Sequence, residues 1–249
     1  MTPQKLIIAL VALGAAVFGV LTWNQDRSTG ETAGEPTRAE KAMEIADARE
    51  PAARVTEAEL AEGFTPLIGD VDGRFHKHGW NHYGPGHFTL DHDTGILASH
   101  GGMGLLWYAA EMFGDFTLRL QFRASKPEAN SGVFLRVPEM VTSDEYIYHS
   151  FEIQIHATGD VPIHRTGAVY DAEAPSEDRT RPAGEWNDME ISFVGDRITV
   201  ALNGARVVDW TAEPRGKIRD FAARGYIGLQ NHDWDSSVYF RNIRVKKLD

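Results

Sequence analysis

The clearest pattern along the chain is a strict alternation of apolar and polar residues in short runs. In residues 116–122, Phe, Leu, Leu and Phe alternate with Thr, Arg and Gln, and residues 191–194 and 198–202 follow a similar period. Successive side chains of a strand point to opposite faces of a sheet, so a period of two predicts half-buried strands. Asn203-Gly204 follows one of these runs and is typical of a type I′ hairpin turn.

No long stretch after Gly63 shows helical spacing, and strands do not alternate with helices. Short strands with frequent turns predict an all-β protein built as an antiparallel sandwich. Residues 56–249 contain no internal repeat, and their length favours one large jelly-roll β-sandwich with a curved sheet. Thr56 and Glu59 have the spacing of a capping box, so a short helix that stops at Gly63 is expected to open this domain.

The N-terminal part of the chain has a different character. Residues 6–23 are apolar apart from Thr22 and follow Lys5, which predicts a signal peptide or membrane anchor over residues 1–23. Leu21-Thr22-Trp23 is a poor cleavage context, so we favour an uncleaved anchor, with a cleaved signal as the alternative. Either one predicts export of the remaining chain, to the periplasm or outside the cell.

Residues 24–55 are rich in Ala, Glu, Gly and Thr and contain few large apolar side chains. Such a segment cannot bury enough surface to offset the entropy that it would lose on ordering, so we predict a flexible linker. The predicted organisation is therefore a signal or anchor at 1–23, a linker at 24–55 and one folded domain at 56–249.

Composition and charge narrow the classes of function. The 249-residue chain has no cysteine, which excludes disulfides, iron–sulfur sites, zinc fingers and thiol nucleophiles. The formal net charge is −11, which argues against general binding of nucleic acid, because that requires a basic face. Histidines between residues 76 and 100 are scattered without the spacing of a zinc site, so no metal ligand is assigned.

An ordered series of short motifs runs through the predicted domain. It includes Gly63-Phe64-Thr65-Pro66-Leu67, Gly79-Trp80, Asn130-Ser131-Gly132-Val133-Phe134, Phe151-Glu152-Ile153-Gln154-Ile155, Gly184-Glu185-Trp186-Asn187, Gly228-Leu229-Gln230-Asn231-His232 and Phe240-Arg241-Asn242-Ile243-Arg244. With the motifs in this order, residues 56–249 resemble the 3-keto-disaccharide hydrolase domain family. The resemblance implies a concanavalin A-like jelly roll and an exported protein that acts on oxidised sugars.

Strand alternation also predicts which polar side chains share a face. The polar side chains that it places opposite an apolar face are Glu152, Gln154 and His156 on one strand, Arg136 on a second, and Gln230 and His232 on a third. If these three faces line one sheet, they bring together carboxylate, amide, guanidinium and imidazole groups. A polar strand face is also the ordinary solvated side of a sheet, and that alternative stays open.

The family resemblance ranks these residues. It favours Glu152 and His232 as catalytic residues and leaves His156 peripheral. The residues expected to bind substrate are Asn130, Arg136, Gln154, Tyr170, Gln230 and Trp107. Among the aromatic residues, Trp107, Tyr170 and Trp234 carry rings that can stack on a sugar.

A 3-keto sugar offers a route that works with one carboxylate. Related jelly-roll glucanases carry three acids on one strand face, whereas this chain has Glu152-x-Gln154-x-His156, which disfavours a retaining mechanism with paired carboxylates. A ketone at C3 acidifies the hydrogen on C2, so a base can form an enolate, the anomeric substituent can leave, and water can add back. We expect Glu152 or His232 to be the base and the other its acid partner, with Arg136 and Gln154 holding the sugar.

This scheme requires no cofactor, although a divalent cation could replace the cationic stabiliser, and the sequence does not decide between them. The expected partner is an oxidised disaccharide or glycoside, with membrane contact through the N-terminal segment only. Two alternatives stay open: a lectin-like carbohydrate-binding module without catalysis, and a hydrolase of unoxidised glycans.

Overall fold

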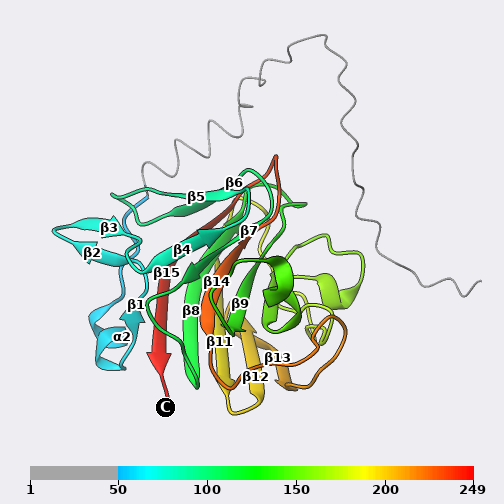
Figure 1. Ribbon diagram of the computed structural model, residues 1–249. Helices are drawn as coiled ribbons and strands as arrows, with labels where there is room; N and C mark the ends of the chain where they lie inside the picture. Colours follow the sequence, from blue (N-terminus) through cyan, green and yellow to red (C-terminus); the bar gives the residue numbers. More distant parts are fainter. Residues whose placement is uncertain (1–49) are drawn as a thin grey trace, which may run out of the picture. The chain divides into compact units, whose positions relative to one another are not determined.

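The computed structural model describes residues 50–249, which all belong to one compact unit (Figure 1). The predicted signal or anchor and most of the predicted linker lie outside the described residues. Within residues 50–249, no helix is long and apolar enough to cross a membrane. Two antiparallel sheets share one apolar core, and a small two-stranded ribbon lies beside them.

The larger sheet has eight strands in the order β13-β12-β11-β8-β15-β6-β5, with β1 also paired to β15. Its members are β1 (Thr65–Pro66), β5 (His87–Leu90), β6 (Leu97–His100), β8 (Phe116–Ala124), β11 (Asn187–Val194), β12 (Arg197–Leu202), β13 (Ala205–Thr211) and β15 (Val238–Lys247). All of its pairings are antiparallel.

The smaller sheet has five strands in the order β10-β9-β14-β7-β4. They are β4 (Trp80–Tyr83), β7 (Gly104–Tyr108), β9 (Ser131–Val137), β10 (Phe151–Ile155) and β14 (Tyr226–Asn231), and β2 (Gly69–Val71) and β3 (Arg74–His76) form the separate ribbon. The described helical elements are α2 (Glu57–Ala61) and two 3₁₀ turns, η1 (Asp144–Tyr148) and η2 (Pro162–His164). The predicted all-β jelly-roll sandwich is confirmed.

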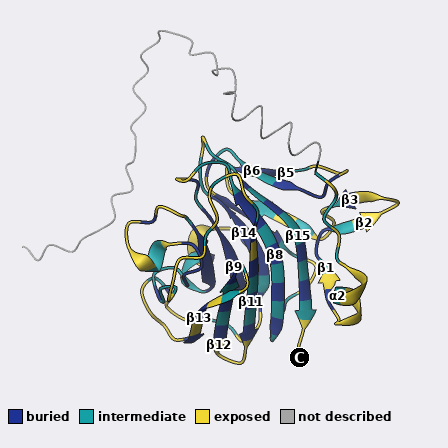
Figure 2. Cartoon of the chain, turned by 180° about the vertical axis from the view of Figure 1, so that it is seen from behind, coloured by how far each residue is buried: buried dark blue, intermediate teal, exposed yellow. Residues whose placement is uncertain are grey.

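The alternating apolar and polar residues of the sequence point to the core and to the surface, respectively. Along β8 the four apolar residues from Phe116 to Phe122 are buried, while the polar residues between them are partly exposed (Figure 2). Phe151 of the smaller sheet meets Phe193 of the larger sheet edge to face, with ring centroids 5.3 Å apart. Burial of such side chains from both sheets removes apolar surface from water and holds the sandwich together.

The predicted hairpin turn also forms. Asn203 and Gly204 join β12 to β13 with φ angles of 51° and 84°, and positive values at both positions are what a type I′ turn needs. The Asn203 side chain accepts the backbone N–H of Asp188 at 2.9 Å and donates to the carbonyl of Arg179 at 2.7 Å. The turn is therefore tied to the neighbouring strand as well as to its own hairpin.

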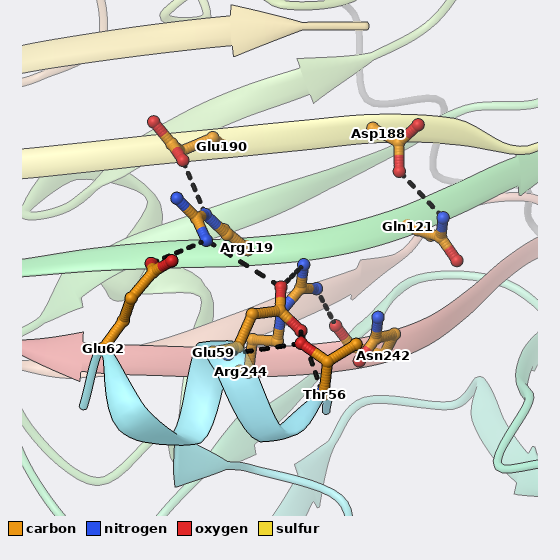
Figure 3. Close-up of polar contacts among 9 residues, drawn as sticks. All are labelled: Thr56, Glu59, Glu62, Arg119, Gln121, Asp188, Glu190, Asn242 and Arg244. Atoms are coloured by element: carbon orange, nitrogen blue, oxygen red, sulfur yellow. Dashed lines mark hydrogen bonds and ion pairs between the residues drawn. The ribbon is translucent and has the colours of Figure 1, made fainter. Parts of the chain in front are cut away.

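The predicted capping box opens the first described helix (Figure 3). Thr56 Oγ1 accepts the backbone N–H of Glu59 at 3.2 Å, and Glu59 Oε2 accepts the backbone N–H of Thr56 at 3.0 Å. Glu59 Oε1 also accepts from Arg244 Nε of β15 at 2.6 Å. One carboxylate thus closes the start of α2 and attaches it to the outer face of the larger sheet.

The end of the predicted linker already contacts the folded domain. Glu50 Oε2 accepts from Trp186 Nε1 and from Arg241 Nη1, both at 2.7 Å, and Glu50 Oε1 pairs with Arg123 at 3.3 Å. The Arg54 guanidinium lies over the Phe75 ring at 4.9 Å. Glu50 and Arg54, which belong to the predicted linker, therefore contact the folded domain.

We predict that Glu59→Gln lowers the free energy of unfolding by about 1 kcal/mol at pH 7, because it weakens both the cap and the ion pair. Burial by itself raises the pKa of Glu59, but hydrogen bonds from Thr56 and Arg244 outweigh it, so the pKa lies below 4.5. The contribution is then present above pH 4.5 and is lost as the pH falls through the lowered pKa. Urea unfolding at several pH values measures it.

The matched control is Glu57→Gln in the same turn, which is expected to change stability little because Glu57 is exposed. The gap between wild type and Glu59→Gln should close on acidification, since a protonated Glu59 resembles glutamine. A gap that stays constant down to acidic pH would contradict the assignment.

Candidate functional site

The outer face of the five-stranded sheet brings together most of the predicted polar positions. Glu152 on β10 lies opposite Phe134 on β9, Phe134 lies opposite Gly228 on β14, and Gly228 lies opposite Trp107 on β7. Directly opposed residues of antiparallel strands have side chains on the same face, so these four form a row across the sheet. The residues between them belong to the core shared with the larger sheet, which places the row on the other face.

A second row runs beside the first. Gln154 lies opposite Gly132, and Gln230 lies opposite Leu105. A Cβ atom on Gly132 would lie 2.4 Å from Glu152 Oε1, well inside contact distance. Glycine at this position is therefore what allows the Glu152 carboxylate to lie across β9.

A buried ion pair occupies one end of this face. Lys217 Nζ lies 2.6 Å from Glu152 Oε2, and the two side chains are only 13% and 3% exposed. The ammonium also lies over the Tyr170 ring, 4.2 Å from its centroid, and 5.4 Å from the centroid of Phe134. The Lys217 ammonium is thus held by an ion pair with Glu152 and by cation–π contacts with two aromatic rings.

Two tyrosines border the ion pair and respond to it. Burial raises the pKa of Tyr170, and the negative charge of Glu152 raises it further. Burial and the same carboxylate also raise the pKa of Tyr146, whose ring lies edge-on to Phe134 at 5.0 Å. Both phenols therefore stay protonated to a higher pH than an ordinary tyrosine.

A histidine–aspartate pair occupies the more open end. His232 Nδ1 lies 2.8 Å from Asp233 Oδ1, and His232 Nε2 lies 3.4 Å from Asn130 Nδ2. Asp233 Oδ2 accepts the backbone N–H of Asn130 at 2.8 Å and also the hydroxyl of Ser236. The His232 side chain is 39% exposed, so solvent reaches it while its ring orientation is held from the Nδ1 side.

The environment keeps Asp233 ionised. Burial by itself raises the pKa of Asp233, but the hydrogen bonds from Ser236, His232 and the Asn130 backbone outweigh it and lower the pKa below its ordinary value. A carboxylate in this position favours the tautomer of His232 that carries its proton on Nδ1. Nε2 is then the ring nitrogen that carries the lone pair and can act as a base.

Gln154 stands between the two charged pairs. With its nitrogen toward β9 it donates to the Ser131 carbonyl at 2.9 Å and to Glu152 Oε1 at 3.3 Å, and this orientation satisfies the amide best. The other end of the amide is the oxygen in this orientation, and it faces Asn130 Oδ1 at 3.4 Å without a hydrogen bond. The Gln154 and Asn130 side chains therefore lie between Glu152 and His232, without a continuous chain of hydrogen bonds from one to the other.

Two buried polar atoms on the same face have no hydrogen-bond partner among the described residues. They are Trp107 Nε1, a donor, and Gln230 Oε1, an acceptor. An unsatisfied buried polar group costs about 1–3 kcal/mol, so such groups in native proteins usually meet water or a ligand. Their position on the same face of the sheet as Glu152 favours a ligand with hydroxyl groups, which can both accept and donate.

Arg136 does not lie on this face, and its predicted position is wrong. Its φ angle is +53°, and the pairing between β9 and β14 shifts by one residue there, which marks a β-bulge. The bulge turns the side chain inward, where it is 1% exposed, donates to the Gly114 carbonyl at 3.0 Å and lies 3.5 Å from the centroid of Phe193. Alternation fails here because it assumes an unbroken pleat.

The remaining predicted positions lie at the margin of the face. Tyr170 is half-buried and stacks on His164, with centroids 4.5 Å apart. Burial lowers the pKa of His156. The Asp233 carboxylate raises this pKa and the His232 imidazole lowers it, so His156 interacts electrostatically with both members of the histidine–aspartate pair. In the part of the chain that the structure describes, no group of three or more His, Cys, Asp or Glu residues is arranged to hold a metal ion.

Sequence analysis missed Lys217 and Asp233. Lys217 lies between β13 and β14, in a segment without strand periodicity, so no local pattern connects it to Glu152. Asp233 directly follows His232, and the adjacency of an imidazole and a carboxylate was the signal that could have identified it.

The fold and sequence are similar to those of known carbohydrate-related proteins. The profile of the 3-keto-alpha-glucoside-1,2-lyase-like domain family matches residues 63–246. A 3-keto-disaccharide hydrolase from Bacteroides thetaiotaomicron is 27% identical, and the match covers 76% of this chain and 80% of that protein.

Solved structures agree with this family at the level of the fold. A crystal structure from Parabacteroides distasonis, provisionally assigned as a glycosyl hydrolase, aligns with a TM-score of 0.62 and 26% identity, over 74% of this chain and 99% of that one. A Bacillus subtilis protein of unknown function with a galectin-like fold aligns with a TM-score of 0.51 and 13% identity, over 74% of this chain and 94% of that one.

The position of Arg136 makes a prediction about stability. Arg136→Ala leaves the Gly114 carbonyl without its donor and opens a cavity against Phe193, so we expect the free energy of unfolding to fall by about 3 kcal/mol. Arg206→Ala, which removes an exposed cation, should cost less than about 1 kcal/mol. Urea unfolding compares the two, and equal small losses would show that Arg136 is not part of the core.

Proposed function

Because the chain belongs to the 3-keto-alpha-glucoside-1,2-lyase-like domain family, we propose that it is an exported enzyme that cleaves the glycosidic bond of 3-keto-glycosides and 3-keto-disaccharides. The observation that carries the proposal is the arrangement on the outer face of the five-stranded sheet. A buried Glu152–Lys217 ion pair and an oriented His232–Asp233 pair lie on one face, with the Gln154 and Asn130 side chains between them.

The proposed reaction is an elimination followed by addition of water. A base removes the C2 proton, and the electron pair enters the C2–C3 bond to give an enolate at the C3 oxygen. The carbonyl then re-forms, a double bond forms between C1 and C2, and the bond from C1 to the leaving oxygen breaks, with a proton delivered to that oxygen. Water adds to C1 and a proton returns to C2, so the sum is hydrolysis.

His232 fits the role of base best. Its side chain is partly exposed, and Asp233 holds the proton on Nδ1, which is the arrangement that general-base histidines use. Glu152 is 3% exposed and paired with an ammonium group. Of the two assignments left open by the sequence, the structure therefore favours His232 as the base.

Lys217 supplies the positive charge that Arg136 was expected to supply. An ammonium fixed in a water-poor site stabilises a developing enolate oxygen and can give a proton to the leaving group. Glu152 then acts as the group that holds Lys217 in place and restores charge balance. The acid partner of His232 in this proposal is the Glu152–Lys217 pair rather than Glu152 alone.

The remaining substrate contacts follow from the unpaired and half-exposed polar groups. Trp107 Nε1 offers a donor and Gln230 Oε1 an acceptor to the sugar hydroxyls. The amides of Asn130 and Gln154 lie between the charged pairs, where the oxidised ring would be held. Tyr170 adds an aromatic face beside Lys217.

A second candidate is a carbohydrate-binding module without catalysis. The observation in its favour is the burial of Glu152, which leaves little of the carboxylate open to a ligand. A hydrolase of unoxidised glycans is supported less, because Asp233, the carboxylate near His232, is separated from Glu152 by Gln154 and Asn130 and already accepts three hydrogen bonds.

One experiment separates these candidates. The protein is incubated in D₂O with the 3-keto-glucoside of p-nitrophenol and, in parallel, with the unoxidised glucoside. We expect release of p-nitrophenol from the keto substrate only, and deuterium at C2 of the 3-keto-glucose product, because that carbon loses and regains a proton. Absorbance follows release, and mass spectrometry follows the label, with an enzyme-free sample as the blank.

The variants test the roles. His232→Ala should lower kcat by about 10²–10⁴-fold, and Lys217→Met by about 10²–10³-fold. Retention of hydrogen at C2 would exclude elimination, and equal cleavage of both substrates would exclude keto specificity. Binding of sugar without turnover of either substrate would identify a binding module.

The Asp233 carboxylate provides an independent prediction. Asp233→Asn keeps the shape but lets His232 adopt the other tautomer, so kcat should fall by about 10–100-fold with little change in KM. Asp235→Asn, which alters an exposed carboxylate two residues away that pairs with Lys126, should leave kcat unchanged. Equal activity of the two variants in steady-state assays would remove Asp233 from the mechanism.

A further inference from the structure

Trp234 is a large apolar side chain left in solvent beside the site. It is 75% exposed, more than any other large hydrophobic residue in the described part of the chain. Exposed apolar surface is unfavourable in water, and a large exposed aromatic ring next to a polar site is a common feature of binding surfaces. Trp234 follows His232 by two residues, so their Cα atoms are at most about 7 Å apart.

The loop that carries Trp234 is held by hydrogen bonds on both sides. The Asp233 carbonyl accepts the backbone N–H of Gly102 at 2.8 Å, and the Asp233 carboxylate accepts the backbone N–H of Asn130 at 2.8 Å. Ser237 N–H donates to Ser125 Oγ, and the Ser125 N–H donates to the Ser237 carbonyl, both at 2.9 Å. The exposure of Trp234 is therefore not the result of an unattached loop.

The indole itself has a defined support. A Cβ atom on Gly102 would lie 2.6 Å from Trp234 Cε2 and 2.7 Å from Cζ2, so the ring rests directly on the Gly102 backbone. With φ at +96°, Gly102 has a conformation that other residues rarely adopt. One side of the ring is thus placed by the backbone, and most of the remaining surface is open.

The loop that carries this ring adjoins the accessible side of the site. Glu152 and Lys217 are closed from solvent, whereas His232 is 39% exposed and shares the Asp233 carboxylate with the Trp234 loop. A substrate whose oxidised ring meets His232 would extend its next ring toward the open end. An aromatic face there offers apolar contact to the C–H groups of a pyranose, and because no charge is involved, it suits a neutral sugar.

We propose that Trp234 is the platform for the second sugar ring, the leaving-group pyranose of a 3-keto disaccharide. This inference rests on the proposed function, since it names the part of the substrate beyond the cleaved bond. The platform contributes to disaccharide recognition and takes no part in the bond changes at C1 and C2.

The test compares a substrate that has the second ring with one that lacks it. Trp234→Ala should lower kcat/KM for a 3-keto disaccharide by about tenfold, which corresponds to about 1.4 kcal/mol. It should leave kcat/KM for methyl 3-keto-glucoside within twofold, and Trp234→Phe should retain most of the activity on the disaccharide. Val194→Ala, which alters an exposed apolar residue on the larger sheet, is the control and should change neither.

A binding arm keeps this test independent of turnover. Calorimetric titration with an unoxidised disaccharide and with the corresponding methyl glucoside measures binding by wild type and by Trp234→Ala. Selective weakening of disaccharide binding supports the platform even if no keto substrate is cleaved, an outcome that would contradict the proposed function alone. Equal effects on both ligands, no effect on either, or no disaccharide binding by wild type would overturn the platform.

Discussion

The register between β10, β9 and β14 is the constraint on which the rest of the site depends. It aligns Glu152, Phe134 and Gly228 in one row, and because the pleat has a period of two, it sends their neighbours into the core. A slip of one residue would exchange the faces, burying Glu152 among the aromatic rings of the sandwich. The apolar core therefore selects the register, and the register places Glu152 and its row on the face opposite that core.

The charged groups of this face are arranged in pairs, for an electrostatic reason. A carboxylate as buried as Glu152 is costly unless a counter-charge and hydrogen bonds replace water, and Lys217 with Gln154 provides them. Asp233 receives comparable support from His232, Asn130 and Ser236. Such pairs add little net stability, so their presence on one face is better explained by chemistry than by folding.

The polar groups on the outer faces of the two sheets have different roles. The outer face of the larger sheet carries ion pairs that hold α2 and residue 50 against it, such as Glu59 with Arg244 and Glu50 with Arg241. These contacts are structural, because they join the beginning of the described chain to β15, its last strand. The smaller sheet instead carries groups supplied by its loops, including Lys217 and Trp234, and it is this sheet that the proposed chemistry uses.

The sequence by itself determined the elements and most of the face. Alternation along residues 116–122, the Asn203-Gly204 turn and the capping box at Thr56 are local, since each follows from the geometry of a few consecutive residues. The shared face of Glu152, Gln154 and Gln230 follows from the same rule. Only the tertiary structure decided the positions of Arg136 and Lys217. A bulge between two strands turned Arg136 inward, and long-range packing brought Lys217 to Glu152 across 65 residues, and neither event leaves a local periodic signal.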